Sequence, residues 1–556
     1  MDRKKAKKQR KLVASLAVLS LSVSLLAGCG STKEDDTKAG AANASNNAAS
    51  ANASNSSTAS SSNATDATAP VDEHYDVTVS TYDIAKAMTD PQSDALLQKV
   101  QKDTNLTFKP LGVTWNDYNE KYKLWAASGQ LPDMFLYEMT NGPTVSQWIK
   151  QGLVREIPES LYGKYPNLNK VLNLPDAQST KVDGKFYGIP RLSKNSSDEW
   201  ALERGFIVRK DWMEKLGIQT PKTFDEYLAM FKAFADNDPD GNGKKDTIGM
   251  TTNFLDVLNT TVKLGSAVPN LGGWMQEDGK WIPAIASKGM SDYVTKYRKL
   301  YEEGALDKDF ALLKAGDGGD KFAQGNVGAL NIQISDASLK GMKDKWDKFP
   351  HNKSFEDSIA ILPAWDAPDG SNYRFYGSTF YTEIYFNNKV DDKKLDSLLK
   401  FIDFELSDQG RDLFTYGIEG TDFKKENGKV ENLKPLAYPS TGMFFMLNGL
   451  GWGMNTAKEY KQAVVPAPLI DMSAQMYDNL LKNSKPIPMN FDIENLATPA
   501  KVKVAGINWS DAVVKTVLGK DDPVKMWQDQ YASFDQQAIN DAIKEVNDAA
   551  AQKGIK

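Results

Sequence analysis

Histidine and cysteine are the scarcest chemically reactive residues in this chain, with two His and one Cys among 556 residues. One cysteine cannot form a disulfide within a single chain, so the folded part must be stabilised by a large core. With only His74 and His351, the chain offers little for a Ser-His-Asp triad and a histidine-rich zinc site lacks ligands, so the sequence argues against both. A glycosidase needs only two carboxylates, and 73 Asp and Glu residues leave that enzyme class open.

Basic runs are absent after Lys11, and the chain has no P-loop pattern. The first 28 residues carry seven positive charges and one negative charge, so their removal takes the net charge from −6 to −12. An acidic chain without a basic patch is a poor nucleic-acid binder. We therefore expect no nucleic-acid partner.

The first 28 residues have the layout of a secretory signal. Seven Lys and Arg residues precede a fifteen-residue uncharged apolar run, Leu12 to Leu26, which is short for a membrane-spanning helix. The small residues Ala27 and Gly28 then precede Cys29, the only cysteine. Residues 1–28 are therefore interpreted as a signal peptide. An ordinary signal peptide with an incidental cysteine is the alternative.

The four residues Leu26-Ala27-Gly28-Cys29 resemble the lipobox of bacterial lipoproteins. The resemblance implies that the signal is cut before Cys29 and that the Cys29 thiol carries covalent lipid, such as palmitate. Each buried methylene contributes roughly 0.8 kcal/mol, so two or three acyl chains give stable anchoring. We expect a chain that is anchored at the extracellular face of the cell membrane and does not span it.

The segment after the lipobox is rich in Ala, Asn, Ser and Thr. Residues 31–70 contain no large apolar side chain, so no core can offset the entropy of ordering them. Residues 29–70 are predicted to be the lipidated cysteine and a disordered tether that holds the folded part away from the membrane.

Regular structure is predicted from Tyr75 onward. Alternating and apolar runs predict strands at 76–80, 106–110, 134–137, 205–209 and 382–387, with helices between them, as at 91–102, 118–127 and 393–406. Strands that alternate with helices favour an α/β fold with mostly parallel sheets. Thr223 is a predicted helix N-cap, with Glu226 completing a capping box. About 490 residues follow the tether, more than one core usually supports, so at least two lobes are expected.

The loop from Asp238 to Asp246 is the sharpest local motif. Oxygen-bearing side chains occupy positions 1, 3, 5 and 9, and a glycine occupies position 6, as in calcium-binding loops. The predicted calcium ligands are Asp238, Asp240, Asn242, Asp246 and the backbone carbonyl of Lys244. Position 12 is Gly249, so the bidentate glutamate of an EF-hand is missing. A structural calcium site is predicted, and a plain surface turn is the alternative.

Five further segments stand out in order along the chain: Ala127-Ser128-Gly129-Gln130-Leu131-Pro132-Asp133, Asp183-Gly184-Lys185-Phe186-Tyr187-Gly188-Ile189-Pro190, Arg209 to Gly217, Pro221 to Tyr227, and Phe322 to Gly328. In this order they resemble extracellular solute-binding protein family 1, the receptors of carbohydrate ABC importers. Each is weak alone, but together behind a lipobox they span roughly residues 75–550. The length and the Asp238 loop are similar to the large oligosaccharide-binding branch of that family.

The resemblance implies a two-lobed periplasmic-binding-protein-like fold of type II, with ligand held in a cleft and closed upon by a hinge. By that analogy residues 75–190 and 383–435 form lobe 1, and residues 191–382 and 436–556 form lobe 2. The candidate ligand contacts are a strand-end residue where the family places a cleft residue, two residues at an expected lobe crossing and two tryptophans whose glycine-rich surroundings suit exposed loops. These are Tyr137, then Trp200 and Arg204, then Trp274 and Trp452. For each aromatic residue, a ring packed in the core or on a lobe surface is the alternative.

The expected function is that of a substrate-binding component of an ABC importer, which captures an oligosaccharide and delivers it to the permease transmembrane subunits. No catalysis is expected, and a monomer is expected. A receptor for a peptide or another polar solute is the main alternative. A secreted enzyme acting on polysaccharide and an adhesin or scaffold are the others.

Overall fold

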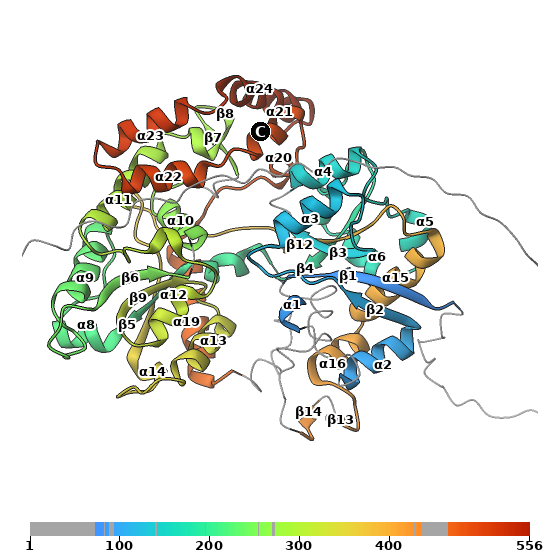
Figure 1. Ribbon diagram of the computed structural model, residues 1–556, viewed down its shortest axis with the longest axis horizontal. Coiled ribbons are helices and arrows are strands. Elements are labelled where there is room, and N and C mark those ends of the chain that lie inside the picture. Colours follow the sequence, from blue (N-terminus) through green and yellow to red (C-terminus); the bar gives the residue numbers. More distant parts are fainter. Residues whose placement is uncertain are drawn as a thin grey trace, which may run out of the picture. The chain divides into compact units, whose positions relative to one another are not determined.

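The computed structural model describes residues 73–82, 84–87, 94–138, 142–194, 196–253, 255–268, 273–426, 429–434 and 465–555. Two β-sheets, each surrounded by its own helices, organise these residues (Figure 1). No helix in these ranges is both long and apolar enough to cross a membrane. The signal peptide, Cys29 and the tether of residues 29–70 lie outside the described residues.

The first sheet has five strands in the order β2-β1-β3-β12-β4. These strands are β2 (Leu106–Pro110), β1 (Tyr75–Ser80), β3 (Met134–Glu138), β12 (Phe380–Phe386) and β4 (Gly188–Leu192). Its core also takes in side chains from α1 (Ile84–Ala87), α2 (Ala95–Thr104), α3 (Tyr118–Ala127), α4 (Gly142–Lys150), α5 (Glu159–Tyr162), α6 (Pro166–Leu172), α15 (Asp392–Glu405) and α16 (Asp408–Tyr416). The short helix α7 (Pro175–Gln178) precedes β4.

The second sheet has four strands in the order β10-β5-β9-β6. These strands are β10 (Ile359–Leu362), β5 (Gly205–Arg209), β9 (Val327–Ile332) and β6 (Ile248–Thr252). Two adjoining clusters of buried residues cover it, with side chains from α8 (Lys210–Leu216), α9 (Phe224–Asp236), α10 (Leu255–Leu264), η4 (Ala284–Ala286), α11 (Gly289–Glu302), η5 (Phe310–Leu312), α12 (Asp317–Ala323), α13 (Asp336–Trp346), α14 (Phe355–Ser358) and α19 (Ala467–Asn483).

The sheets are mostly parallel, as predicted, but each contains one strand that runs against the others. In the first sheet β1 is parallel to β2 and β3, whereas β12 is antiparallel to β3 and β4. In the second sheet β9 is parallel to β6, whereas β5 is antiparallel to β9 and β10. The strand that enters each sheet from the other one is the antiparallel strand in both cases. It needs no crossover helix of the kind that parallel neighbours require.

Short segments carry the chain between the sheets. The first crossing runs from β4 to β5 through the 3-10 helix η3 (Ser197–Glu203). The return runs from β10 to β12 through β11 (Tyr373–Arg374), which pairs with β15 (Lys485–Pro486). Helix α19 packs against η3, β10 and α13.

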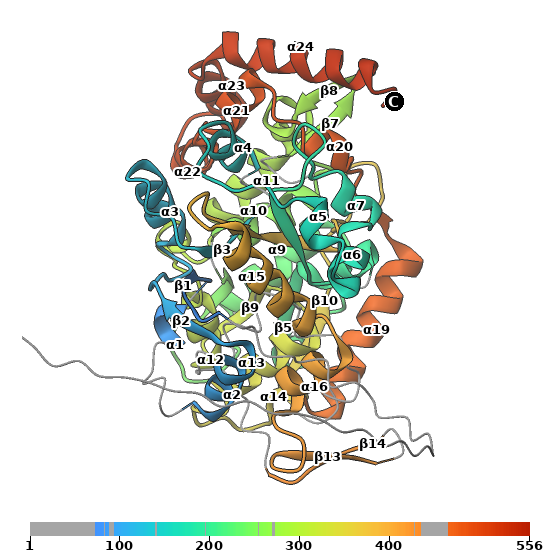
Figure 2. The ribbon, with the colours of Figure 1, turned by 90° about the vertical axis from the view of Figure 1, so that its right-hand side faces the viewer.

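A third core forms near the C-terminus. The hairpin of β7 (Trp274–Glu277) and β8 (Lys280–Pro283) packs with α20 (Phe491–Glu494), α21 (Pro499–Ala505) and α24 (Gln536–Gln552). Figure 2 shows α24 along the edge of this group, where it contacts α21 and β8. Helices α22 (Trp509–Leu518) and α23 (Pro523–Ala532) pack on α11 instead. A last hairpin, β13 (Phe423–Glu426) with β14 (Lys429–Asn432), follows α16.

Local sequence signals placed many of these elements correctly. The predicted strands at 76–80, 106–110, 134–137, 205–209 and 382–387 are confirmed as β1, β2, β3, β5 and β12, with bounds that differ by a residue or two. The capping box is also confirmed. Thr223 Oγ1 accepts from the Glu226 amide while the Glu226 carboxylate accepts from the Thr223 amide.

Candidate ligand-binding site

Trp200 lies in η3, on the first crossing, and its exposed fraction is 8%. Its indole nitrogen donates to the Ser378 carbonyl, and its ring packs 5.5 Å from the ring of Phe375, both on the return crossing. The Lys194 ammonium lies 5.1 Å from the Trp200 ring centroid. The ring therefore joins the two crossings and has little surface left for a ligand in this conformation.

Arg204 ends η3 and lies in a compact charged group. Its guanidinium donates to the Glu203 carboxylate at 2.9 Å and lies 5.9 Å from the Phe375 ring centroid. Glu203 also accepts from Gln333 and lies 3.7 Å from the Lys194 ammonium. The side chain of Arg204 is 15% exposed. Arg204 and Trp200 are thus brought together at the crossing, as the sequence predicts, although their partners here are other residues of the chain.

Tyr137 lies inside the first core, with an exposed fraction of zero. Its hydroxyl donates to Asn119 Oδ1 at 2.5 Å, and its ring packs 5.0 Å from Trp148 and 5.6 Å from Tyr122. Burial and the nearby charges of Glu138 and Glu120 raise the pKa of the Tyr137 phenol. Tyr137 is therefore a core residue in this conformation and offers no surface to a ligand.

The expectation that Trp274 lies in an exposed loop is wrong. Trp274 begins β7 and is only 2% exposed. Its amide donates to a Glu494 carboxylate oxygen at 2.8 Å, and the Lys501 ammonium lies 5.8 Å from its ring. Residues more than 200 positions away cover this ring, which the neighbouring glycines could not indicate. Trp452 lies outside the described residues.

Three aromatic residues that the sequence reasoning did not single out meet at one edge of the first sheet. Tyr82 follows β1, Trp115 follows β2, and Tyr118 begins α3. The Tyr82 ring centroid lies 4.8 Å from those of Trp115 and Tyr118, and Trp115 and Tyr118 are 5.6 Å apart. This is the edge where parallel strands end, which is where open α/β sheets bind ligands. That rule, applied to the predicted strands, could have found these residues.

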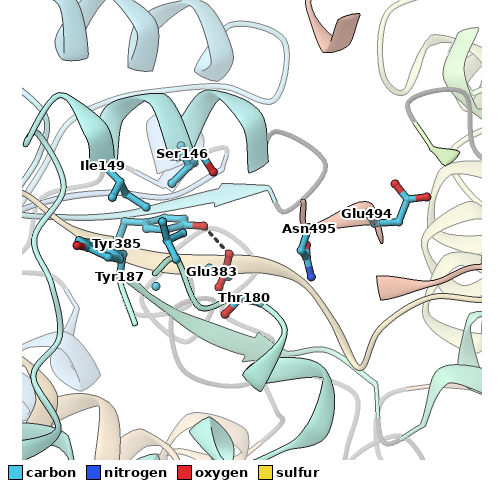
Figure 3. A pocket seen from close by; sticks show the side chains of 11 residues that line it. Ser146, Ile149, Thr180, Tyr187, Glu383, Tyr385, Glu494 and Asn495 are labelled. Atoms are coloured by element: carbon cyan, nitrogen blue, oxygen red, sulfur yellow. Dashed lines mark hydrogen bonds between the residues drawn. The ribbon is translucent and has the colours of Figure 1, made fainter. Parts of the chain in front are cut away.

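A small pocket also lies beside the first sheet, at β12. It has a volume of about 40 Å³ and is lined from α4, the segment before β4, β12 and the residues at α20; its lining includes Ser146, Thr180, Tyr187, Glu383, Tyr385, Glu494 and Asn495. Figure 3 shows Glu383 and Thr180 directed into the same space, while the Glu494 carboxylate points away from them. One water needs roughly 10–15 Å³, so the pocket suits a few waters and is too small for a sugar ring.

Glu383 is the chemically unusual group of this pocket. It is 5% exposed and accepts a hydrogen bond from the Tyr385 hydroxyl. Burial raises its pKa to about 7, against the opposing effect of hydrogen bonds from Tyr385 and Thr180. Nearby, Asn495 donates to the Ser179 hydroxyl at 2.8 Å, which links the α20 segment to the first sheet.

The Asp238 loop is exposed and internally hydrogen-bonded. The Asn242 side-chain amide donates to Asp240 at 2.8 Å and to Asp246 at 3.0 Å, and the Asn242 backbone donates to Asp238 at 3.1 Å. Three carboxylates therefore converge on one asparagine. Within the described ranges, no three His, Cys, Asp or Glu side chains are disposed to hold a metal ion.

Gly249, at position 12 of this loop, is packed against backbone. A Cβ there would lie 2.3 Å from the Phe231 carbonyl oxygen and 2.6 Å from that of Ala305. The β6 strand thus leaves no room for the bidentate glutamate of an EF-hand. Any twelfth-position ligand must come from water or from another part of the chain.

Comparison with known proteins identifies the family. The model of the bacterial extracellular solute-binding protein family matches residues 83–412, which is more than half of the chain. This chain therefore belongs to the bacterial extracellular solute-binding proteins. The family is one of solute-binding proteins and not of enzymes.

Two relatives come from Bacillus subtilis (strain 168). The polygalacturonan/rhamnogalacturonan-binding protein YtcQ is 29% identical over 347 residues, 61% of this chain and 66% of YtcQ. Lipoprotein LipO is 28% identical over 351 residues, 61% of this chain and 67% of LipO. This chain thus spans about two thirds of the length of these relatives.

Solved structures show the same fold. The alginate-binding protein AlgQ2, in its crystal structure without calcium ion, superposes with a TM-score of 0.67 at 18% identity, covering 86% of this chain and 98% of AlgQ2. The predicted periplasmic-binding-protein-like fold is confirmed.

Proposed function

We propose that this chain is the lipid-anchored receptor of an ABC importer, which captures an oligosaccharide by hinge closure and delivers it to the permease subunits. The observation that carries the proposal is the family match over residues 83–412, which takes in strands of both sheets and both crossings between them. The name of YtcQ, a polygalacturonan/rhamnogalacturonan-binding protein, supports a carbohydrate ligand.

The two short crossing segments between the sheets are the proposed hinge. Each sheet has its own core, so each can move as a body while the short crossing segments absorb the change in backbone angles. A ligand that contacts both bodies binds the closed arrangement better and shifts the population toward it. No covalent chemistry on the ligand is required.

A thermal-shift screen of the purified protein against pectic, algal and neutral plant oligosaccharides tests this proposal. A ligand at 100 times its dissociation constant stabilises the folded state by about 2.7 kcal/mol, which shifts the melting temperature visibly. We expect a hit whose oligosaccharide is recovered intact by chromatography. Recovery of shortened products would instead make the protein an enzyme, and no hit with any sugar would reject the carbohydrate proposal.

The proposed anchor rests on Cys29 and on the lipoprotein name of LipO. In the native host, the protein is expected in the membrane fraction and in the detergent phase of a Triton X-114 partition. Cys29→Ser should release it to the medium or leave it with its signal uncut. Membrane retention of the Cys29→Ser protein after signal cleavage would reject the anchor.

We also propose that the Asp238 loop holds a structural calcium ion. The residue types suit a hard cation: Asp238, Asp240 and Asp246 offer carboxylate oxygens, Asn242 an amide oxygen and Lys244 a backbone carbonyl. The three carboxylates are not disposed around one metal position here, so binding would require these side chains to rearrange. Burial raises the pKa of the Asp240 carboxyl, and the neighbouring Asp238 carboxyl raises it further. A divalent cation would relieve that repulsion in place of the Asn242 amide.

A further inference from the structure

Helices α20 and α21 contact both sheet-bearing bodies of the molecule. Residues 491–505, which include both helices, pack in the third core, and Tyr531 and Phe534 pack against that core and against the core of the second sheet. The third core is therefore joined to the second body. On its other side, α21 contacts α4, whose Val145 and Trp148 lie in the core of the first sheet. Residues 491–505 thus link the two bodies in addition to the two crossings, and we call them the latch.

Two neighbouring residues hold the latch on opposite sides. The Glu494 carboxylate accepts a hydrogen bond from the Trp274 amide of the third core at 2.8 Å. The side-chain amide of Asn495 donates to the Ser179 hydroxyl of the first body, also at 2.8 Å. Ser179 in turn donates to the Asp176 carbonyl at 2.7 Å, so its hydroxyl is both acceptor and donor. The Asn495–Ser179 hydrogen bond is therefore a direct and specific contact between the latch and the first body.

Asp176 connects this contact to the hinge. Its carboxylate accepts from the Thr379 amide at 2.8 Å and from the Thr379 hydroxyl at 2.6 Å. Thr379 ends the return crossing, and its carbonyl accepts from the amides of Ser193 and Lys194 at the start of the first crossing. A chain of hydrogen bonds therefore runs from the latch through Ser179 to both crossings.

The seam between the latch and the first sheet contains the small pocket at β12. Glu494 and Asn495 of the latch line it together with Glu383 and Thr180 of the first body (Figure 3). Its volume of about 40 Å³ leaves room for a few waters. Separation at a seam that holds water exposes less apolar surface than separation within a packed core. The latch can therefore leave the first body here while both cores stay intact.

Glu383 lies in this seam without a cation paired to it. The titratable groups that face it from the sheet, from the segment before β4 and from the latch are Tyr137, Tyr385, Tyr187, Glu494 and Lys501. Helix α4 lines the pocket with apolar and hydroxyl side chains. Lys501 is the cation of this set, and its ammonium donates to the Ile493 and Glu494 carbonyls. Burial without an opposing charge favours the neutral carboxyl and raises the pKa of Glu383 to about 7.

We propose that the latch holds the two bodies together while Glu383 is neutral and releases them when Glu383 ionises. An ionised carboxylate must be hydrated, and water reaches Glu383 freely once the latch has left the first sheet. The latched state thus keeps a proton that the open state releases. Closure is therefore favoured in acidic solution and weakens as the pH rises from 4.5 to about 7. The inference rests on the proposed function, because it regulates the hinge closure that captures the ligand.

Small-angle X-ray scattering of the purified, ligand-free protein measures the separation of the bodies against pH. One released proton lowers the ratio of latched to open molecules by up to about tenfold per pH unit. We expect the radius of gyration to rise between pH 4.5 and 7 and to be level above pH 7. A constant radius of gyration across this range would overturn the inference. That result would leave the receptor proposal standing, because no sugar is present in the measurement.

Variants assign the effect to the seam. Glu383→Gln is neutral at every pH, so its radius of gyration should keep the low-pH value throughout. Glu405→Gln is the matched control, because Glu405 is also a buried carboxyl but lies on α15, and it should leave the pH dependence unchanged. Asn495→Ala removes the contact with Ser179 and should open the protein at low pH as well. Ser179→Thr keeps the hydroxyl and should stay latched there.

The melting temperature of each variant distinguishes a folding defect from a released latch. If Glu383→Gln does not fold, Tyr385→Phe takes its place. It removes a hydrogen bond that lowers the pKa of Glu383, so the opening should move to higher pH. Unchanged scattering of folded Asn495→Ala and Ser179→Ala proteins would overturn the latch. Opening with pH that persists in Glu383→Gln, or that disappears in Glu405→Gln, would overturn the role of Glu383.

Discussion

The indole nitrogen of Trp200 donates a hydrogen bond to the backbone carbonyl of Ser378, 178 residues further along the chain. The bond joins the crossing that leaves the first sheet to the crossing that returns to it. Gly377 allows the approach, because a Cβ there would lie 3.0 Å from the Trp200 ring. One tryptophan thus couples the two segments on which hinge closure depends.

Replacing Trp200 by phenylalanine should destabilise the protein, because the buried Ser378 carbonyl loses its donor. An unsatisfied buried group costs about 1–3 kcal/mol. Urea unfolding measures the change. Trp365→Phe is the control, since Trp365 is also buried and its indole nitrogen has no hydrogen-bond partner among the described residues. Equal losses in the two variants would show that the hydrogen bond is not responsible.

Glu383 should make stability depend on pH. Its pKa is about 7 in the folded protein and 4.5 for an ordinary glutamate, so between these values the unfolded chain releases a proton that the folded chain keeps. Stability is therefore greatest below pH 4.5, falls as the pH rises to about 7 and is level above it. The full loss is about 3 kcal/mol.

Glu383→Gln removes this titration. Relative to the original protein, the variant should gain stability progressively from pH 4.5 to 7 and keep that gain above pH 7. A poorer hydrogen bond from the introduced amide would change the unfolding free energy of the variant by the same amount at every pH. The test is therefore how the difference in unfolding free energy between the two proteins varies with pH. Denaturant unfolding at a series of pH values measures it, and parallel curves for the two proteins would refute the assignment.

Calcium should raise the melting temperature, and EDTA should lower it again, if the Asp238 loop holds the ion. Asp240→Asn should abolish the calcium response, because a ligand charge is lost. Lys244→Ala should retain it, since only the Lys244 backbone carbonyl is a proposed ligand. A calcium response that survives Asp240→Asn would place the ion elsewhere.

Thr223→Ala should cost about 1 kcal/mol, the usual loss for an N-cap. Helix α9 buries Tyr227, Phe231 and Phe234, so fraying at its start reaches the second core. Thr223→Ser, which keeps the hydroxyl, should cost much less. Urea unfolding with an unchanged m-value is the measurement, and equal losses for Ala and Ser would assign the effect to the lost methyl group.

Local signals in the sequence predict an element correctly where interactions between nearby residues determine its structure. The period-two alternation of β1 and the Thr223–Glu226 capping box depend on neighbours within a few positions, and both are confirmed. The direction of β12 was beyond such signals, because it depends on which strand of a distant segment lies beside it.

In the candidate site, too, features that depend on nearby residues were predictable and features that depend on distant segments were not. The prediction of Trp200 and Arg204 at a crossing follows from the family resemblance, which implies that the chain passes between lobes there. Trp274 was assigned to the surface because glycine residues precede it, yet Glu494 and helix α21 bury it. Tyr82 and Trp115 were missed because each stands alone in its own loop, and only the parallel pairing of β1 and β2 brings them together.

The hairpin of β7 and β8 imposes an order on how this protein is made. Its strand residue Trp281 donates to and accepts from Asn547 of α24, 266 residues later. At synthesis rates of about 5–20 residues per second, the hairpin waits roughly 13 to 53 seconds for its partner helix to emerge from the ribosome. Its apolar face stays uncovered until α20, α21 and then α24 emerge, so the nascent chain presents a binding surface for chaperones that the finished protein no longer has.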